Sequence, residues 1–151
     1  MIRKAKISDS SQIHQLINSC AKNGKVLERS LNYIYEHIRD FWVYIDKKKI
    51  IGCCALSVVG WKNLGEVKSL VVAPSFRNHG IGKKLVKKCL WEAPSLGVDK
   101  AFALTFVPDF FKKLGFHLIE RKKLPHKIWS DCINCPYFPD CCEEAVIIKL
   151  T

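Results

Sequence analysis

A chain of 151 residues with 48% hydrophobic content fits one domain with a single core, and it leaves no room for a second domain of ordinary size. The longest apolar run, residues 50–59, is far shorter than the roughly 20 residues of a membrane span, so we expect no membrane partner. The net charge of +11 attracts polyanions, but the lysine clusters are scattered along the chain, which is typical of a solvated surface and argues against a nucleic-acid partner.

The eight cysteines fit either a disulfide framework or reduced thiols. Disulfide frameworks serve chains that are too small to build a core, and the charged start, residues 1–7, lacks the apolar region of a signal peptide. We therefore expect a cytoplasmic chain with reduced thiols that begins near Met1 and forms one domain over residues 1–151.

The first part of the chain predicts a strand, two helices and a β-hairpin. Apolar residues alternate with basic ones at first, then recur at helical spacing, and then give way to β-branched and aromatic runs. Ser8 to Ser11 offer caps for the first helix, and Ser30 is suited to cap the second. The expected elements are a strand at 2–7, helices at 13–20 and 31–38, and strands at 41–45 and 50–59.

The second part predicts alternating strands and helices. Pro74 ends the first of these strands, because proline cannot continue a central ladder. The expected elements are a strand at 66–72, a helix from Ile81 to Leu90, a strand at 100–107, a short helix at 109–114 and strands at 116–120 and 143–150. Three prolines exclude long regular elements from residues 124–142, which we expect to form an ordered loop or a short helix.

The most informative segment connects the strand at 66–72 to the helix that begins at Ile81. Gly80 and Gly82 let backbone N–H groups approach a phosphate closely, and the helix N-terminus adds partial positive charge. The third glycine of a dinucleotide-binding fingerprint is absent, and so is the Gly-Lys-Ser/Thr ending of a P-loop. The segment therefore predicts an anion cradle of another kind, to which Lys83 and Lys84 can add charge.

Two motifs in this order resemble the GNAT superfamily of acyltransferases. The first is Arg77-x-x-Gly80-x-Gly82 after a strand that ends in Val-x-Pro, and the second is Phe110-Phe111-Lys112-Lys113-Leu114-Gly115-Phe116. The resemblance implies an α+β fold whose central sheet is mixed and mostly antiparallel, flanked by helices and splayed into a cleft for acyl-CoA. It also implies acetyl-CoA as the acyl donor.

The resemblance assigns residues to the donor. Leu70, Val71 and Val72 would offer backbone hydrogen bonds to the pantetheine arm of CoA. Phe110 and Phe111 would pack against the acyl-CoA and the core. Those that would hold the pyrophosphate are Arg77, Asn78, His79, Gly80, Ile81 and Gly82, with Lys83 beside them.

Acyl transfer to an amine needs a base, an oxyanion donor and a way to protonate the leaving thiolate. By resemblance, Glu66 is the candidate base, acting through water, and the Leu70 N–H is the candidate oxyanion donor. The alternative for Glu66 is a surface carboxylate paired with a lysine. Phe111 stands where many relatives have a tyrosine and cannot donate a proton, so the acid would be water, Ser69 or no dedicated group.

Residues 26–41 and 124–141 resemble the short, single-domain N-acetylglutamate synthases. That resemblance implies acetyl transfer to the α-amine of glutamate, the entry to arginine biosynthesis, with glutamine as a second acceptor, and it implies a homodimer. An amino-dicarboxylate favours bidentate guanidinium partners, so Arg29 is the first candidate to bind it. Lys68, Ser69 and Arg39 are further candidates, and a surface position at a helix start is the alternative for Arg29.

The cysteines near the C-terminus leave three interpretations open. Cys132, Cys135 and Cys141 supply three thiolates, and His126 or Cys142 can complete a zinc tetrahedron. Reduced, packed thiols and a local disulfide are the alternatives, and we assign no metal.

Two other functions compete with glutamate acetylation. The same fold can acetylate another amine, on a protein, a peptide or a small molecule, although a cationic cleft disfavours polyamines. A non-catalytic acyl-CoA sensor or a nucleic-acid binder would bind its ligand without turnover.

Overall fold

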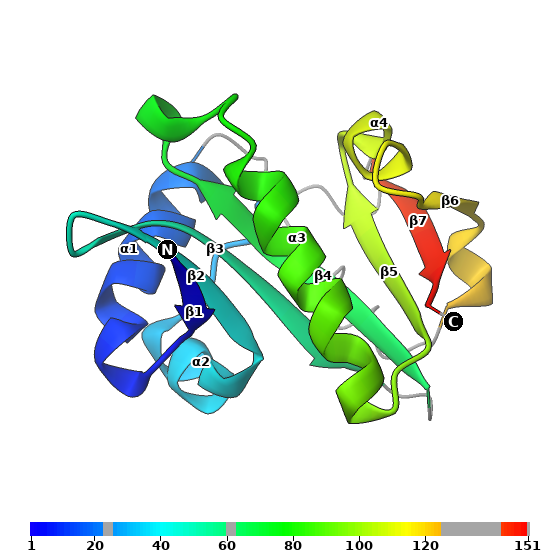
Figure 1. Cartoon of the computed structure of the whole chain (residues 1–151), viewed down its shortest axis with the longest axis horizontal. Helices are drawn as coiled ribbons and strands as arrows, with labels where there is room; N and C mark the ends of the chain where they lie inside the picture. Colours follow the sequence, from blue (N-terminus) through cyan, green and yellow to red (C-terminus); the bar gives the residue numbers. More distant parts are fainter. Residues whose placement is uncertain (23–25, 60–62, 125–142, 151) are drawn as a thin grey trace. The chain divides into compact units, whose positions relative to one another are not determined.

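The computed structural model describes residues 1–22, 26–59, 63–124 and 143–150. Two compact units divide the chain, one made of residues 1–56 and 67–91 and the other of residues 57–66 and 92–151. The strands form a seven-stranded sheet in the order β1-β2-β3-β4-β5-β7-β6 (Figure 1). β4 and β5 run parallel, and the other pairings described are antiparallel, which confirms the predicted α+β fold with a mixed, mostly antiparallel sheet.

The first unit is built around a hydrophobic core between its strands and helices. Its elements are β1 (Ile2–Lys4), α1 (Ser10–Ala21), α2 (Leu31–Glu36), β2 (Phe41–Asp46), β3 (Lys49–Val58), β4 (Leu64–Val72) and α3 (Ile81–Glu92). Ile13 and Ile17 lie one helical turn apart on α1, and Phe41 and Val43 alternate on β2, so each element turns one buried face to the core. The predicted hairpin is confirmed, with Asp46 opposite Lys49.

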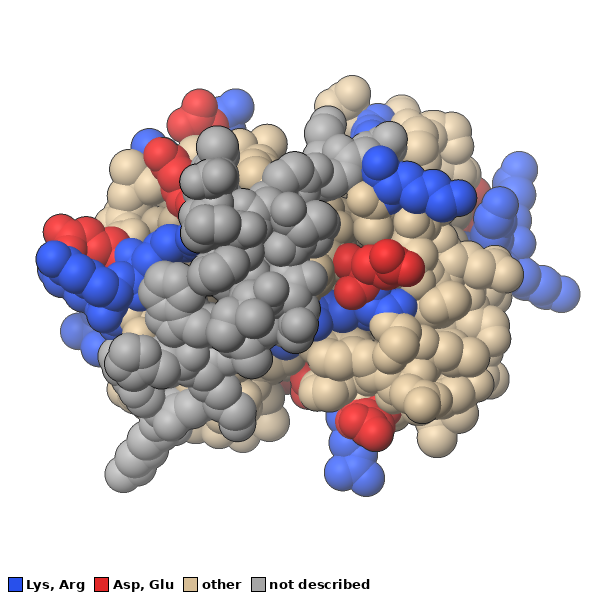
Figure 2. All heavy atoms as spheres, turned by 180° about the vertical axis from the view of Figure 1, so that it is seen from behind, with Lys and Arg blue, Asp and Glu red and all other residues tan. Residues whose placement is uncertain are grey.

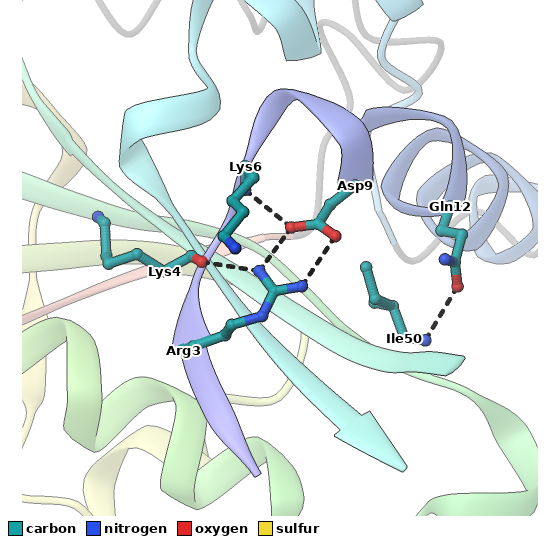
Figure 3. Close-up of polar contacts among 6 residues, drawn as sticks. All are labelled: Arg3, Lys4, Lys6, Asp9, Gln12 and Ile50. Carbon is teal, nitrogen blue, oxygen red and sulfur yellow. Dashed lines mark hydrogen bonds and ion pairs between the residues drawn. The ribbon is translucent and has the colours of Figure 1, made fainter. Parts of the chain in front are cut away.

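The start of the chain differs from its prediction. The strand ends at Lys4 instead of residue 7, and a 3₁₀ turn over Ile7–Asp9 precedes α1. Asp9 makes no side-chain cap bond to α1, because its carboxylate accepts from Arg3 Nη1 at 2.7 Å, from Arg3 Nη2 at 3.0 Å and from the Lys6 N–H at 2.7 Å (Figure 3). These bonds fold the chain into a turn, so the strand ends before residue 7. They also lower the pKa of Asp9, chiefly through the bond from Arg3.

A close approach between a helix and a strand fixes the position of α3. A Cβ atom on Gly52 of β3 would stand 3.1 Å from Leu85 Cδ1 and 3.3 Å from Ile81 Cγ2. Glycine therefore lets the first turns of α3 lie directly against β3, as Figure 1 shows for the helix and its strand. This packing fixes the N-terminus of α3 in its position against β3.

The second unit contains β5 (Lys100–Thr105), α4 (Pro108–Lys112), β6 (His117–Ile119) and β7 (Glu144–Lys149). The last strand enters the sheet between β5 and β6, so segments far apart in sequence become neighbours. The start of β4 joins this unit, because Leu64–Glu66 pair with Lys100–Phe102 of β5. The buried residues Leu64, Phe102, Leu124 and Ala145 form its core.

None of the helices in the described part of the chain is long and apolar enough to cross a bilayer. The predicted loop at 124–142 lies outside the described residues except for Leu124, which follows a 3₁₀ turn over Arg121–Lys123. The predicted zinc candidates His126, Cys132, Cys135, Cys141 and Cys142 therefore also lie outside them.

Candidate active site

The loop that leads from β4 to α3 has the backbone that its sequence predicts. Pro74 ends β4 by opening a 3₁₀ turn over Pro74–Phe76, and the Phe76 N–H donates to the Ala73 carbonyl at 2.9 Å. Asn78 and Gly80 then take left-handed conformations, with φ of 66° and 79°. A Cβ atom on Gly80 would meet nothing within 4 Å, so conformation and not crowding is what requires glycine there.

The N-terminus of α3 follows directly. The Gly80 carbonyl accepts from the Lys84 N–H at 3.1 Å, so the helix is continuous from its first residue. The N–H groups of Ile81, Gly82 and Lys83 belong to the first turn, where an α-helix offers no acceptor, and the helix dipole places partial positive charge beside them. The residues of the predicted anion cradle, 77–82, thus lie in one continuous stretch of backbone that leads into the helix, and anion binding there stays a prediction.

Arg77 and His79 fix this loop by bonds to the main chain. Arg77 Nε donates to the Val72 carbonyl at 3.0 Å, and Arg77 Nη2 lies 3.6 Å from Cys20 Sγ on α1. The His79 Nδ1 lies 3.2 Å from the Phe76 carbonyl, which can only accept, so Nδ1 carries the proton. The prediction that Arg77 holds a pyrophosphate stays a prediction, and the bond to Val72 gives it a loop-anchoring role as well.

A strained residue interrupts β4. Ser69, which is buried, has a φ of 54°, a left-handed conformation that a non-glycine residue rarely adopts inside a strand. The Cys53 thiol of β3 lies 3.4 Å from the Ser69 carbonyl, and the Cys54 thiol lies 3.8 Å from the Lys68 carbonyl. The strain re-aims the backbone immediately before Leu70, whose N–H is the predicted oxyanion donor. Serine gives no sequence signal for such a conformation, so sequence reasoning missed it.

The thiols behind this strand are not nucleophiles. Burial is the largest cause that raises the pKa of Cys53, and a hydrogen bond with Cys89 is the largest cause that raises the pKa of Cys54. Both thiols therefore stay protonated near neutral pH and act as weak donors to the carbonyls of β4. This agrees with the predicted direct transfer, which needs no covalent intermediate on a cysteine.

Arg29, Tyr33 and Lys68 form a cationic cluster around one aromatic ring. Arg29 is only 9% exposed, and its guanidinium carbon lies 4.4 Å from the centroid of the Tyr33 ring. The Lys68 Nζ, on β4, lies 5.5 Å from the same centroid. Two cations predicted to bind the acceptor are therefore brought together by a third residue that sequence reasoning missed.

The local backbone explains why Arg29 stands there. The side-chain amide of Asn18, on α1, makes two hydrogen bonds to the backbone of Arg29. Asn18 Nδ2 donates to the Arg29 carbonyl at 2.9 Å, and the Arg29 N–H donates to Asn18 Oδ1 at 3.0 Å. Ser30 then caps α2 as predicted, with its hydroxyl accepting from the Tyr33 N–H at 3.0 Å. The alternative of a surface position for Arg29 is wrong. Arg39 lies exposed in a 3₁₀ turn, so of the two candidates only Arg29 belongs to the cluster.

Glu66 and Phe111 are both buried. Glu66 is 7% exposed and faces Phe102 in the β4–β5 register, so the alternative of an exposed surface carboxylate is wrong. Phe111 is 4% exposed, and its ring makes edge contacts with Phe110 at 5.1 Å and Phe116 at 5.2 Å between centroids. Phe111 thus contributes to the core of the second unit, and its contact with an acyl-CoA stays a prediction.

Basic side chains stand in separate groups on the face of the molecule in Figure 2, with acidic side chains among them. This dispersal agrees with the scattered lysines of the sequence.

A protein-family comparison identifies the fold. Residues 37–118, which include β4, the loop and α3, match the model described as an acetyltransferase (GNAT) domain. The chain belongs to the GNAT family of acetyltransferases. The resemblance inferred from the two motifs is confirmed, and the domain is an acetyltransferase whose acyl donor is acetyl-CoA.

Relatives extend this result over nearly the whole chain. The GNAT domain is 42% identical over 149 residues to an uncharacterized N-acetyltransferase of Chlorobaculum tepidum, covering 99% of this chain and 96% of that protein. It is 36% identical over 135 residues to an amino-acid acetyltransferase of Mycobacterium tuberculosis, covering 87% of this chain and 76% of the relative.

A solved structure is similar over the full length of the domain. The N-acetylglutamate synthase of Neisseria gonorrhoeae, complexed with coenzyme A and N-acetyl-glutamate, superimposes with a TM-score of 0.90 at 26% identity. The match covers 100% of this chain but 35% of that one, so the GNAT domain corresponds to about a third of the synthase.

Proposed function

We propose that this GNAT domain transfers the acetyl group of acetyl-CoA to the α-amine of L-glutamate, the first step of arginine biosynthesis. The observation that carries the proposal is that the buried guanidinium of Arg29 and the ammonium of Lys68 both lie close to the ring of Tyr33. A small acceptor with two carboxylates satisfies such a pair, whereas a cationic acceptor is repelled. The amino-acid acetyltransferase of M. tuberculosis supports an amino-acid acceptor, and the N-acetylglutamate synthase of N. gonorrhoeae supports glutamate.

Acceptor binding would gain from the order already present around Arg29. Asn18 holds both the N–H and the carbonyl of Arg29, and the ring of Tyr33 supports the guanidinium. A side chain held in this way loses little conformational entropy when a carboxylate arrives. The guanidinium offers two parallel N–H donors, which suits one carboxylate of the acceptor.

Transfer would then proceed by direct attack. Glu66 accepts a proton from the ammonium of the acceptor through water, and the free amine attacks the thioester carbon. A C–N bond forms, the carbonyl oxygen becomes an oxyanion that the Leu70 N–H stabilises, and the C–S bond then breaks. The attacking nitrogen, now positively charged, gives up a proton, and the leaving CoA thiolate gains one through water or through Ser69, because Phe111 has no proton to give.

The donor would be held mainly by backbone. The N–H groups at the start of a helix, together with a left-handed loop before it, suit an anionic group, and the pyrophosphate of CoA is such a group. Lys83 and Lys84, both exposed, add charge that attracts the phosphates without a fixed geometry.

Thiol release from acetyl-CoA, measured against a panel of amino acids and peptide amines, tests the proposal. We expect glutamate-dependent release, with kcat/KM for glutamate reduced about 100-fold in Arg29→Ala and kcat reduced in Glu66→Gln at little change in KM. Arg39→Ala, which removes an exposed arginine outside the cluster, is the matched control and keeps parental kinetics. Release with another amine and none with glutamate would overturn the assignment of the acceptor.

A further inference from the structure

The hydroxyl group of Tyr33 is buried and has no hydrogen-bond partner among the described residues. Such groups are rare in folded proteins, because a buried hydroxyl without a partner has lost its hydrogen bonds to water and gained none in return. Tyr33 is also the residue whose ring contacts both cations of the cluster, Arg29 and Lys68. An unmet donor at this position points to a ligand that meets it.

The ring that carries the hydroxyl is held firmly. The His37 ring stacks on it with a centroid distance of 4.0 Å and an interplanar angle of 19°. The His37 Nδ1 also lies 2.8 Å from the Tyr33 carbonyl, and the Ser30 hydroxyl holds the Tyr33 N–H. Arg29, Tyr33 and His37 are spaced four residues apart, so the three side chains stack along one side of α2. The hydroxyl is therefore presented in a fixed direction.

The polar groups of the cluster are suited to donate. A guanidinium and an ammonium, such as those of Arg29 and Lys68, can only donate hydrogen bonds. The Tyr33 hydroxyl has a proton that nothing in the described chain accepts. A carboxylate, which only accepts, is complementary to three donors. A carboxamide is not, because its NH₂ group would turn two donors toward groups that also donate.

We propose that the Tyr33 hydroxyl donates a hydrogen bond to the side-chain carboxylate of the acceptor and thereby makes the enzyme select glutamate over glutamine. This inference rests on the proposed function and adds a residue to it. Arg29 and Lys68 supply the charge that attracts a carboxylate, while Tyr33 supplies the directional bond that an amide satisfies less well.

Tyr33→Phe is the decisive variant, since it keeps the ring, the stack with His37 and the support of Arg29. Tyr35→Phe is its matched control, because Tyr35 lies on the same helix with 42% of its surface exposed. We expect Tyr33→Phe to lower kcat/KM for glutamate about 10- to 100-fold, mostly through KM. The activity with glutamine and the KM for acetyl-CoA should change about twofold or less. Tyr35→Phe should match the parent protein.

Unchanged glutamate kinetics in Tyr33→Phe would overturn the inference, and so would an equal loss with glutamate and glutamine. Thermal unfolding gives a second measurement that does not depend on turnover. Without ligand, Tyr33→Phe should melt at least as high as the parent, because it removes a buried hydroxyl that has no partner. A structural role for the hydroxyl predicts the opposite, a lower melting temperature.

Glutarate separates the inference from the proposed function. It has the carboxylates of glutamate but no amine, so it tests the subsite without acetyl transfer. We expect glutarate to raise the melting temperature of the parent and of Tyr35→Phe, and to raise that of Tyr33→Phe much less. If glutamate supports no turnover but this pattern holds, the proposed acceptor is wrong and the carboxylate subsite stands. If glutarate shifts the parent and Tyr33→Phe equally, the subsite is wrong.

Discussion

The loop before α3 and the cluster around Tyr33 lie in the same compact unit, but they are built in opposite ways. The loop is one contiguous stretch, residues 77–83, whose useful groups are backbone N–H groups exposed by two left-handed residues and a helix start. The cluster takes one side chain from the segment before α2, one from α2 and one from β4. We therefore expect the backbone groups to bind what every acyl-CoA shares, and the side chains to set the choice of acceptor.

This difference predicts how each region tolerates substitution. A backbone site is damaged by residues that cannot adopt its conformation and is indifferent to most side chains that can. A side-chain site is damaged by the loss of one polar group even when the fold is untouched. The variants below test this contrast, from the largest expected change in free energy to the smallest.

Gly80→Val should damage donor binding most. Valine at a φ of 79° is strained by about 1–2 kcal/mol, and the loop must move its N–H groups to relieve it. We expect the KM for acetyl-CoA to rise about 100-fold, as for the loss of two charge-assisted bonds. Steady-state kinetics at saturating glutamate would measure this.

Gly97→Val controls for the backbone strain itself. Gly97 has a φ of 77° at the end of a 3₁₀ turn in the second unit, and a Cβ atom there also meets nothing within 4 Å. Both variants should lose similar stability, but only Gly80→Val should change the KM for acetyl-CoA. A similar rise in both would mean that global strain, and not the loop, explains the effect.

Asp9→Asn separates stability from specificity. It breaks the pair with Arg3 that joins β1 to the start of α1, so we expect unfolding free energy at pH 7 to fall by about 2 kcal/mol with no change in acceptor preference. The pKa of Asp9 is lowered in the folded protein. The pair therefore stabilises the fold fully at pH values above the ordinary pKa of a carboxyl group, and this stabilisation is lost as the pH falls through the lowered pKa.

Urea unfolding at several pH values would measure this. The difference between the parent and Asp9→Asn should shrink below about pH 4. Asp109→Asn is the control, because its carboxylate is 91% exposed and stands 3.9 Å from Lys112, and it should change stability little. A difference that persists unchanged in acid would show that the Asp9 charge is not what stabilises the fold.

Lys68→Met should weaken the use of glutamate without affecting acetyl-CoA. Methionine keeps a flexible apolar stem against Tyr33 and removes the ammonium 5.5 Å from the ring. We expect kcat/KM for glutamate to fall about 10-fold and the KM for acetyl-CoA to stay constant. Lys87→Met, on the exposed side of α3, is the control. A loss confined to acetyl-CoA would assign Lys68 to the donor side instead.

The same contrast explains what could be predicted from the sequence. Helices and strands followed from periodicity, and the loop at 77–83 followed because all its determinants are adjacent. Tyr33 could not be found in this way, since its partners come from residues 29 and 68 and only the folded β4 brings the last of them near.

Two features of the fold escaped prediction for physical reasons. The strand predicted to reach residue 7 ends at Lys4, because Asp9 binds Arg3 and the Lys6 N–H, a combination that no periodicity encodes. The place of β7 between β5 and β6 depends on pairing across a long stretch of chain, which a local pattern cannot specify.

Asn78→Gly should have the smallest effect, and it tests the backbone side most directly. Asn78 has a φ of 66°, a conformation that glycine adopts without strain, so the N–H groups should keep their positions when the side chain is removed. We expect the KM for acetyl-CoA to stay within about twofold of the parent, whereas Asn78→Val, which resists a positive φ, should raise it. A large rise in Asn78→Gly would mean that the Asn78 amide itself binds the donor, and the loop would then be a side-chain site like the cluster around Tyr33.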